Sequence, residues 1–385
     1  MEGPSTGGVR VSLDVAAFEA EAQAYLATRP DATLSFGFSV HGERTVRYLR
    51  TEGAQHAPLP HASSIYEIGS VSKLPMATVL AALEARGVLS LDDPISKHLP
   101  DALVLKPEIA AITVRQLACH CSGLPDTGAE HLKIQESEAR GDNPPWGYYT
   151  QYIRYRRDHL LSDLETADLV YPTGGGHSYS VLGMGVLGYL MEHASGRGYE
   201  DLVHEIVTGP LGMADTGYAS NTPEQQSRMV YAYDASGAPD PNWHYDVMLP
   251  QAGLRSTVAD MLTFGEANIR ASLNPDDDSE TSSALRRARE VHWRAPDGVT
   301  LAGTDIPLPF VQGLAWMGFK TADPERFNWW HPGTTQFYNA GLGVSPETGI
   351  AFFAVSSAHS SIGDPGQHMP MVMGWFFKAV AAASG

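Results

Sequence analysis

The chain has 385 residues, of which 43% are hydrophobic and 18% charged, as expected for a globular protein with ample core in one large domain or two packed ones. The formal net charge of −18 would repel a phosphate backbone, which excludes a nucleic-acid partner. Residues 1–8 lack the basic and apolar regions of a secretory signal, and no apolar run is long enough to span a bilayer. We therefore expect a cytoplasmic protein with no membrane partner, and the two closely spaced cysteines, Cys119 and Cys121, agree with a reducing compartment.

The first predicted elements are a helix and a β-hairpin. Ser12 is a candidate N-cap for the helix. Four residues recur on one face of this helix: Val15, Phe18, Ala22 and Tyr25. The runs 33–40 and 45–49 predict two strands joined through residues 41–44.

The stretch 66–77 predicts a turn or short strand that ends at Gly69 and a helix that begins near Ser70 and ends at Gly87. Ser70 and Lys73 are three residues apart, so their side chains share one helix face. A serine at a helix N-terminus faces unpaired backbone donors, and a desolvated lysine one turn later can lose its proton and accept that of the serine. The pair is therefore a candidate nucleophile and base.

The same spacing has a simpler interpretation, an N-terminal serine followed by an exposed lysine. A Ser-x-x-Lys pattern occurs about once by chance in a chain of this length. Of the six lysines, only Lys73 has a serine three residues before it. The choice between the two interpretations depends on the rest of the chain.

The middle of the chain is predicted to be mostly helical. Thr113 is a candidate N-cap, residues 126–147 are predicted to form a long surface loop, and the apolar run 181–193 predicts a helix. The glycine-rich turn 172–180 lacks the Gly-Lys-Ser/Thr of a phosphate-binding loop, so we reject a phosphate site there. Five aromatic residues fit either a packed helix face or the roof of a substrate pocket: Trp146, Tyr148, Tyr149, Tyr152 and Tyr155.

The last part of the chain predicts strands and a final helix over 368–382. The predicted strands are 313–319, 336–344 and 350–356. With the N-terminal hairpin, they predict an α/β (α+β) fold whose antiparallel sheet is built from both termini and flanked by helices. The predicted domains are 1–70 with 305–385 for the sheet and 71–304 for a mostly helical insertion, with the active site in the cleft between them.

Four stretches follow one another at sensible intervals: Glu67–Lys73, Ile112–Asp126, Pro210–Met213 and Ala252–Thr257. In this order they resemble the serine β-lactamase and penicillin-binding-protein superfamily. The resemblance is strongest to the branch of class C β-lactamases, DD-carboxypeptidases and family VIII esterases, and it covers nearly the whole chain from about Ser35. It implies a β-lactamase/transpeptidase-like fold.

The resemblance implies catalytic roles for Ser70, Lys73 and Tyr179. That superfamily arranges a Ser-x-x-Lys pair, a Tyr-x-Asn loop and a Lys-Thr-Gly or His-x-Gly strand around one cleft. Tyr179 matches the loop, and its alternative role is that of a buried structural tyrosine. A phenolate is favoured beside an ammonium, so we expect Tyr179 and Lys73 to share one proton.

The third element falls on His331-Pro332-Gly333, and the implied oxyanion hole is formed by the backbone N–H groups of Ser70 and Thr334. His331 and Gly333 are candidate substrate-binding residues, although His331 could instead be a strand-end histidine bonded locally. Val181 stands where the loop has asparagine, and His331 lacks the fixed charge of lysine. Both departures argue against a dedicated antibiotic-defence enzyme.

We therefore expect a serine acyl-transfer enzyme that passes an acyl group from an ester, thioester or activated amide to water, as an esterase, or to an amine or alcohol, as a transacylase. Val181, Trp146 and Tyr149 complete the candidate substrate-binding set. The alternatives are a D-amino-acid peptidase or weak β-lactamase, and a non-catalytic binding or assembly protein. Since the fifteen histidines form no His-Glu-x-x-His pair, we expect no metal and no cofactor. The expected partners are small molecules, in a monomer or homodimer.

Overall fold

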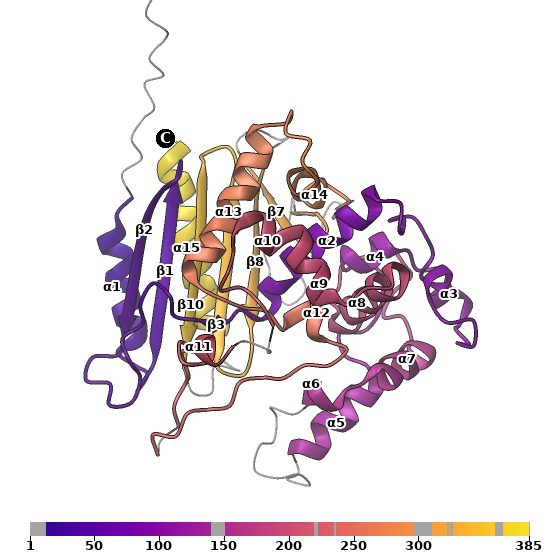
Figure 1. Cartoon of the computed structure of the whole chain (residues 1–385), viewed down its shortest axis with the longest axis horizontal. Coiled ribbons are helices and arrows are strands. Elements are labelled where there is room, and N and C mark those ends of the chain that lie inside the picture. The colour runs from indigo at the N-terminus through magenta and orange to yellow at the C-terminus, as the bar shows by residue number, and fades with distance from the viewer. Residues whose placement is uncertain are drawn as a thin grey trace, which may run out of the picture.

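A computed structural model describes residues 13–139, 151–218, 222–234, 236–295, 310–321, 323, 326–358 and 365–384. Its centre is an antiparallel eight-stranded sheet in the order β2-β1-β10-β9-β8-β7-β6-β5 (Figure 1). The N-terminal strand β1 pairs with the C-terminal strand β10, which confirms the predicted sheet built from both ends of the chain. The strands are β1 Thr33–Val40, β2 Glu43–Arg50, β5 Trp293–Arg294, β6 Phe310–Gln312, β7 Met317–Lys320, β8 Phe327–Thr334, β9 Tyr338–Ser345 and β10 Ile350–Ser357.

The N-terminal hairpin is tighter than the sequence predicts. Val40 pairs with Glu43, so the connection is only His41 and Gly42, whose φ angles are 51° and 90°. A two-residue loop with both φ angles positive matches the right-handed twist of the flanking strands. On β1, a Cβ at Gly37 would lie 2.8 Å from Leu262 Cδ1, so glycine allows a helix to approach this strand closely.

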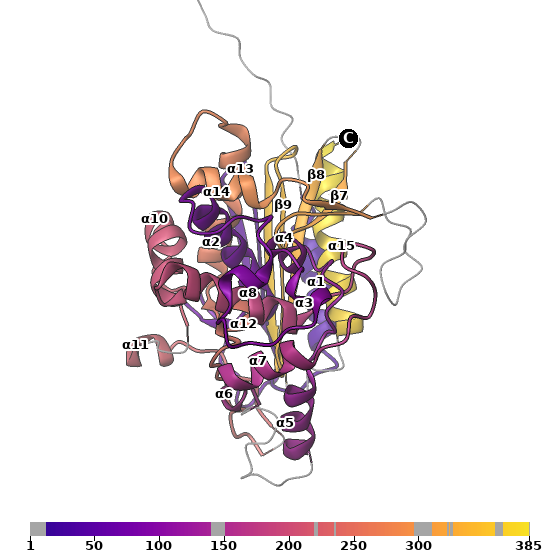
Figure 2. The ribbon, with the colours of Figure 1, turned by 90° about the vertical axis from the view of Figure 1, so that its right-hand side faces the viewer.

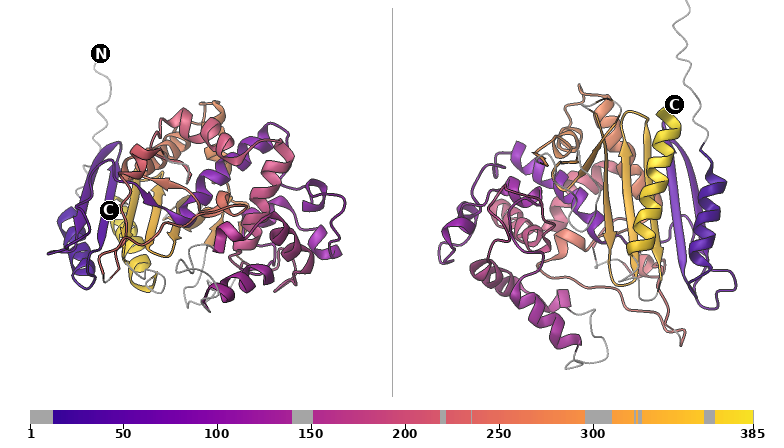
Figure 3. Two further views of the ribbon diagram at one scale, coloured as in Figure 1. Left: turned by 60° about the horizontal axis from the view of Figure 1, so that its bottom comes forward. Right: turned by 180° about the vertical axis from the view of Figure 1, so that it is seen from behind.

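Helices cover both faces of the sheet, which Figure 2 shows nearly edge-on between them. On one face, α1 (Val15–Leu26) and the long α15 (Pro365–Ser384) enclose a core of aromatic and aliphatic side chains, and Figure 3 shows α15 lying along the strands from behind. On the other face, α13 (Val258–Leu273), α14 (Glu280–Ala288) and α2 (Lys73–Ala85) share a continuous core with β8 to β10.

The remaining helices extend from this second face, away from the N-terminal hairpin (Figure 1). The segments that connect these helices carry the Ser122–Asp126 stretch and Tyr179. Two short strands, β3 Tyr66–Glu67 and β4 Arg255–Ser256, pair just before the start of α2. The helices are α3 Pro107–Ala110, α4 Val114–Ala118, α5 Ala129–Ala139, α6 Gln151–Arg154, α7 Arg157–Thr166, α8 Val181–Ser195, α9 Tyr199–Val203, α10 Gly209–Leu211, α11 Pro223–Gln226 and α12 Leu249–Ala252, with single turns η1 Gly69–Ser72, η2 Ile95–His98 and η4 His204–Thr208.

The surface loop predicted over 126–147 is wrong in part, because α5 occupies Ala129–Ala139. The residue before this helix, Gly128, has no side chain that could accept from the first backbone N–H groups. The first backbone donors of α5 are instead satisfied from another helix: Asp163 Oδ1 accepts from Glu130 N at 2.7 Å, and Asp163 Oδ2 from His131 N at 3.3 Å. Tyr155 donates to the same carboxylate at 2.7 Å. A cap supplied by the tertiary structure leaves no local sequence signal.

Two smaller predictions also change. The strand predicted over 313–319 contains a turn between β6 and β7, where Ala315 has a φ of 59° and donates its N–H to Ala118 O at 2.8 Å. The cap of α1 is Asp14, whose Oδ1 accepts from Ala17 N at 3.0 Å; Ser12 lies outside the described residues. Thr113 does cap α4, in a capping box with Gln116.

The predicted division into 1–70 with 305–385 and 71–304 stays a prediction. The strand β5 joins the sheet although it lies before residue 305, and α13 packs on that sheet. Among the helices that the structure describes, none is both long and apolar enough to cross a membrane.

Candidate active site

Ser70 lies in the single helical turn η1, immediately before α2. The preceding residue, Gly69, has a φ of +50°, and a Cβ there would lie 2.8 Å from both Thr334 N and Thr334 O. Glycine is therefore needed both for the backbone angle and for the approach of β8. On the other side, Ser72 Oγ accepts from Leu254 N at 3.1 Å and Leu254 O accepts from Ile68 N at 3.2 Å, so the turn is held between β8 and the segment after α12.

Lys73 is fully buried at the first position of α2. Its Nζ lies 2.9 Å from Ser70 Oγ, 3.0 Å from Gln251 O and 2.6 Å from Gln251 Oε1. None of these three partners is charged. Burial lowers the pKa of the Lys73 ammonium from 10.5 to about 7, against a smaller opposing effect of the Asp126 carboxylate. A large fraction of this amine is therefore neutral at pH 7, the state in which it can accept a proton.

Tyr179 precedes α8 and completes a cluster with Ser70 and Lys73. Lys73 Nζ lies 5.1 Å from the centre of its ring, and the phenol interacts with the Ser70 side chain. The ring stacks on His120 at 4.3 Å between ring centres. The ring centre of His331 lies 6.1 Å from that of Tyr179, with the two rings tilted. The structure thus brings together the three residues that the sequence singled out for catalysis.

The protonation state expected for Tyr179 changes, however. Burial raises the pKa of the phenol well above 10, and the nearby Asp126 raises it further, while the contact with Ser70 lowers it only in part. The phenol therefore keeps its proton, and the prediction of a favoured phenolate is wrong. Because the pKa of Lys73 falls while that of Tyr179 rises, the two groups are driven apart into a base and an acid.

The edge of β8 lies directly against the turn that carries Ser70. A Cβ at Gly333 would lie 2.1 Å from Ile68 O and 3.0 Å from Val71 N, so only glycine fits there. Thr334, the next residue, contacts Gly69 through its backbone. The two segments that carry the expected oxyanion donors, the N–H groups of Ser70 and Thr334, are therefore neighbours.

His331 is completely buried on β8. Its Nδ1–H donates to Pro332 O at 2.5 Å, as in the alternative interpretation of a locally bonded histidine. Burial, with a smaller effect of the Lys73 charge, lowers its pKa to about 3. The side chain is neutral at pH 7 and supplies no cation for a substrate carboxylate, so its part in substrate binding stays a prediction.

Val181 is the first residue of α8 and is partly exposed. The N-cap is Ser180, whose Oγ accepts from Gly183 N at 2.9 Å and donates to Pro125 O at 2.6 Å. The backbone N–H of Val181 donates to Asp126 Oδ1 at 3.3 Å. Through Asp126, this helix start holds a negative charge near Lys73 and Tyr179, which sequence reasoning did not assign.

The aromatic cluster divides into two parts. Tyr152 packs on Trp243 at 4.9 Å and on Tyr245 at 5.0 Å between ring centres, and Tyr155 is also buried, as expected for a packed helix face. Trp146 and Tyr149, the two candidates for substrate contact, lie outside the described residues.

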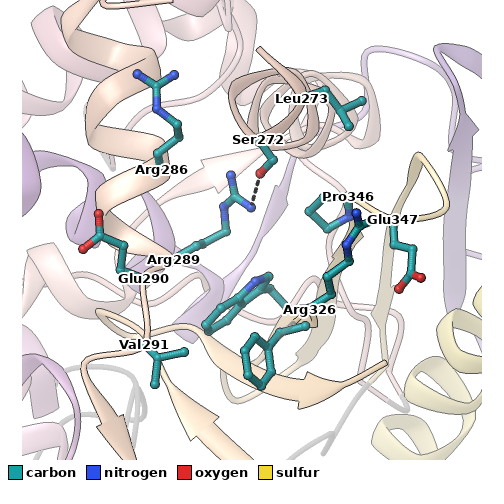
Figure 4. A pocket seen from close by; sticks show the side chains of 11 residues that line it. Ser272, Leu273, Arg286, Arg289, Glu290, Val291, Arg326, Pro346 and Glu347 are labelled. Atoms are coloured by element: carbon teal, nitrogen blue, oxygen red, sulfur yellow. Dashed lines mark hydrogen bonds between the residues drawn. The ribbon is translucent and has the colours of Figure 1, made fainter. Parts of the chain in front are cut away.

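The pocket in Figure 4 is separate from this cluster, and none of the site residues lines it. Its floor is the buried Arg289, which donates to Ser272 Oγ at 2.8 Å and to Asn268 O at 2.6 Å. Arg286 donates to Ala271 O at 3.3 Å. Both arginines thus satisfy carbonyl groups in the C-terminal part of α13, a structural role that the negative end of the helix dipole favours. The lining residues are Ser272, Leu273, Arg286, Arg289, Glu290, Val291, Arg326, Phe327, Trp329, Pro346 and Glu347.

Two further residues at the cluster were missed by sequence reasoning. His120 lies within a stretch that carried the resemblance, but its stacking on Tyr179 has no signal in the local pattern. Gln251 directly precedes another such stretch, and nothing in its sequence context indicates a contact with a lysine 178 residues away. In the described part of the chain, no three histidine, cysteine or acidic side chains are placed to hold a metal ion.

The sequence is similar to those of known proteins. The family model described as Beta-lactamase matches residues 22–368. The D-alanyl-D-alanine-carboxypeptidase/endopeptidase AmpH of Escherichia coli (strain K12) is 29% identical over 263 residues, which cover 67% of this chain and 62% of that protein. Esterase EstB of Burkholderia gladioli is 30% identical over 255 residues, 60% of each chain. The chain thus spans less than two thirds of the length of these relatives.

Solved structures with low sequence identity share the fold. A class C beta lactamase from Rhodobacter sphaeroides superposes with a TM-score of 0.71 at 18% identity, covering 95% of this chain and 99% of that one. A beta-lactamase/D-alanine carboxypeptidase from Yersinia pestis gives a TM-score of 0.69 at 19% identity, with 97% and 100% covered. Since the family model spans most of the sequence, the chain belongs to the beta-lactamase family, the serine β-lactamase-like hydrolases whose members include esterases and carboxypeptidases.

Proposed function

We propose that this protein is a serine ester hydrolase that works through an acyl-Ser70 intermediate. The observation that carries the proposal is the contact of 2.9 Å between Ser70 Oγ and Lys73 Nζ, an amine whose pKa burial lowers to about 7. A neutral amine in hydrogen-bond contact with a hydroxyl is the arrangement that general-base activation of a nucleophile requires.

In the proposed acylation step, Ser70 Oγ attacks the carbonyl carbon of the ester while its proton passes to Lys73 Nζ. The N–H groups of Ser70 and Thr334 stabilise the resulting oxyanion, each contributing roughly 3–4 kcal/mol by analogy with measured cases. When the tetrahedral intermediate collapses, Tyr179 gives its proton to the leaving alkoxide and takes the proton held by Lys73. In deacylation, water replaces the alcohol and the proton transfers run in reverse.

The side chains around the nucleophile favour uncharged esters over amides that carry a carboxylate. Val181 offers no carboxamide to a substrate amide, and His331 is neutral and buried. The same features argue against efficient β-lactam or D-amino-acid peptide turnover.

Intact-mass spectrometry after mixing with p-nitrophenyl butyrate tests the proposal. We expect a transient butyryl adduct on Ser70 and release of butyrate, and no adduct in Ser70→Ala. An adduct that survives in Ser70→Ala, or none in the native protein with either the ester or a fluorophosphonate, contradicts the proposal, and the second result favours a non-catalytic protein. Adding an amine or alcohol tests transacylation, because an acyl-amide or new ester in place of butyrate would identify a transferase. Rapid nitrocefin turnover would instead identify a β-lactamase.

A further inference from the structure

We infer that Gln251 is the positioning residue for Lys73: its carboxamide oxygen and its backbone carbonyl take both N–H groups of the neutral amine, so that the remaining lone pair faces Ser70. This inference rests on the proposed function, since it assigns how the base of that reaction is aimed. Gln251 itself does not contact the reacting atoms of the substrate.

The hydrogen-bond count at Lys73 carries the inference. A neutral amine has two N–H donors and one lone pair, and Nζ has three partners. Gln251 O and Gln251 Oε1 can only accept, at 3.0 and 2.6 Å, so each takes one N–H. Ser70 Oγ, at 2.9 Å, is the one partner that can donate, and the lone pair is left for its proton.

Without the carboxamide oxygen, this orientation would be lost. The terminal amine rotates freely about its last carbon–nitrogen bond, and with Gln251 O as the single fixed acceptor the second N–H would compete for Ser70 Oγ. The amine would then donate to the nucleophile in part of the population, which keeps the serine proton in place. A general base contributes only when its lone pair lies within reach of the proton that it abstracts.

The fold holds Gln251 rigidly in this place. It is 1% exposed and lies on α12, which packs on α8 (Figure 1). On α8, a Cβ at Gly188 would lie 2.8 Å from Pro250 Cγ, and a Cβ at Gly185 would lie 2.4 Å from Met248 Sδ. These glycines permit the close approach of α12, and the bond from Leu254 N to Ser72 Oγ ties the other end of the segment to the turn of the nucleophile.

Gln251 also explains how the cluster functions with Val181 in the position where related loops carry asparagine. The carboxamide at this site comes from α12 instead of from the start of α8. Lys73 thereby keeps a carboxamide partner without one at position 181.

The test compares Gln251→Met, which keeps the side-chain length and removes the acceptor, with Gln251→Glu, which keeps the acceptor and adds a charge. Single-turnover acylation by p-nitrophenyl butyrate is measured across pH, and exposed Gln23→Met serves as the matched control. We expect Q251M to acylate roughly 10–100-fold more slowly with KM unchanged, part of the general-base contribution. A carboxylate stabilises the adjacent ammonium and so raises the pKa of Lys73. Q251E should therefore reach the wild-type acylation rate only at higher pH, and the rising limb of its pH–rate profile should shift to higher pH.

Wild-type acylation rates in Q251M, or an unshifted limb in Q251E, would overturn the inference while leaving the acyl-Ser70 proposal intact. If Q251M does not fold, the position of the rising limb in the pH–rate profile of Q251E tests the inference by itself. A native protein that gives no adduct with the ester or with a fluorophosphonate would remove the proposed function, and this inference with it.

Discussion

Replacing Lys73 by methionine should stabilise the fold at pH 7 while abolishing turnover. Lys73 is fully buried, and its three hydrogen-bond partners are uncharged. Burial lowers the pKa of its ammonium from 10.5 to about 7. Folding at pH 7 therefore carries the free-energy cost of removing a proton that the unfolded chain would keep.

The magnitude follows from this pKa difference. At about 1.4 kcal/mol for each pKa step, the cost is on the order of 5 kcal/mol at pH 7. Methionine removes that cost but leaves Gln251 and Ser70 without their partner, which offsets roughly 2–3 kcal/mol. We therefore expect the free energy of unfolding of K73M to exceed that of the native protein by about 2–3 kcal/mol at pH 7.

The sign of the pH dependence gives the sharper assay. Between pH 7 and about pH 10.5, the unfolded chain holds the Lys73 proton and the folded chain does not, so the native protein gains stability as the pH rises. The advantage of K73M should shrink accordingly when urea unfolding is repeated at about pH 9.5. Lys320→Met, at an exposed position, is the control. A K73M protein that is less stable than the native protein at pH 7, or whose added stability is independent of pH, would show that burial of Lys73 does not cost folding free energy.

Three further outcomes are expected. Tyr179→Phe should lower turnover of ethyl butyrate, whose leaving alkoxide is strongly basic, by roughly 10²–10³-fold in steady-state assays with an unchanged melting temperature, because it removes the acid for the leaving group; a normal rate would contradict that role. Gly333→Ala should lower the free energy of unfolding by roughly 2–4 kcal/mol in urea, because its Cβ would lie 2.1 Å from Ile68 O; an unaffected midpoint would show that β8 can move away without cost. Val181→Asn should raise acylation by benzylpenicillin relative to the ester about tenfold in competition experiments, the value of one added hydrogen bond, and an unaltered ratio would exclude this position from substrate selection.

The cluster of Ser70, Lys73 and Tyr179 could be predicted from the sequence in part because two of its members are only three residues apart. Their spacing puts both side chains on one helix face, and the resemblance favoured a contact between them, which the structure gives as 2.9 Å. Tyr179 could be identified only from the order of the motifs along the chain, because its approach to Ser70 depends on how α8 packs. Its protonation state needed the structure, because burial decides it.

The contact of Gln251 with Lys73 and the capping of α5 could not be predicted from the sequence. The carboxamide reaches Lys73 from 178 residues away, and α5 is capped by Asp163 from a different helix. In both cases the stabilising partner is distant in the sequence, so the local sequence pattern gives no signal for the contact. The turn at Ala315 is similar, since a positive φ at alanine is held by a hydrogen bond to Ala118 O from a distant helix.

In the proposed mechanism, neutral Lys73 takes the proton of Ser70 as the acyl group is transferred. The most direct measurement is the pre-steady-state rate of acyl-Ser70 formation as a function of pH, followed by rapid quench and intact mass. We expect a rate that rises with pH through about 7, as Lys73 loses its proton, and then reaches a plateau. A rate that is flat across this range, or that falls as the pH rises through 7, would contradict it.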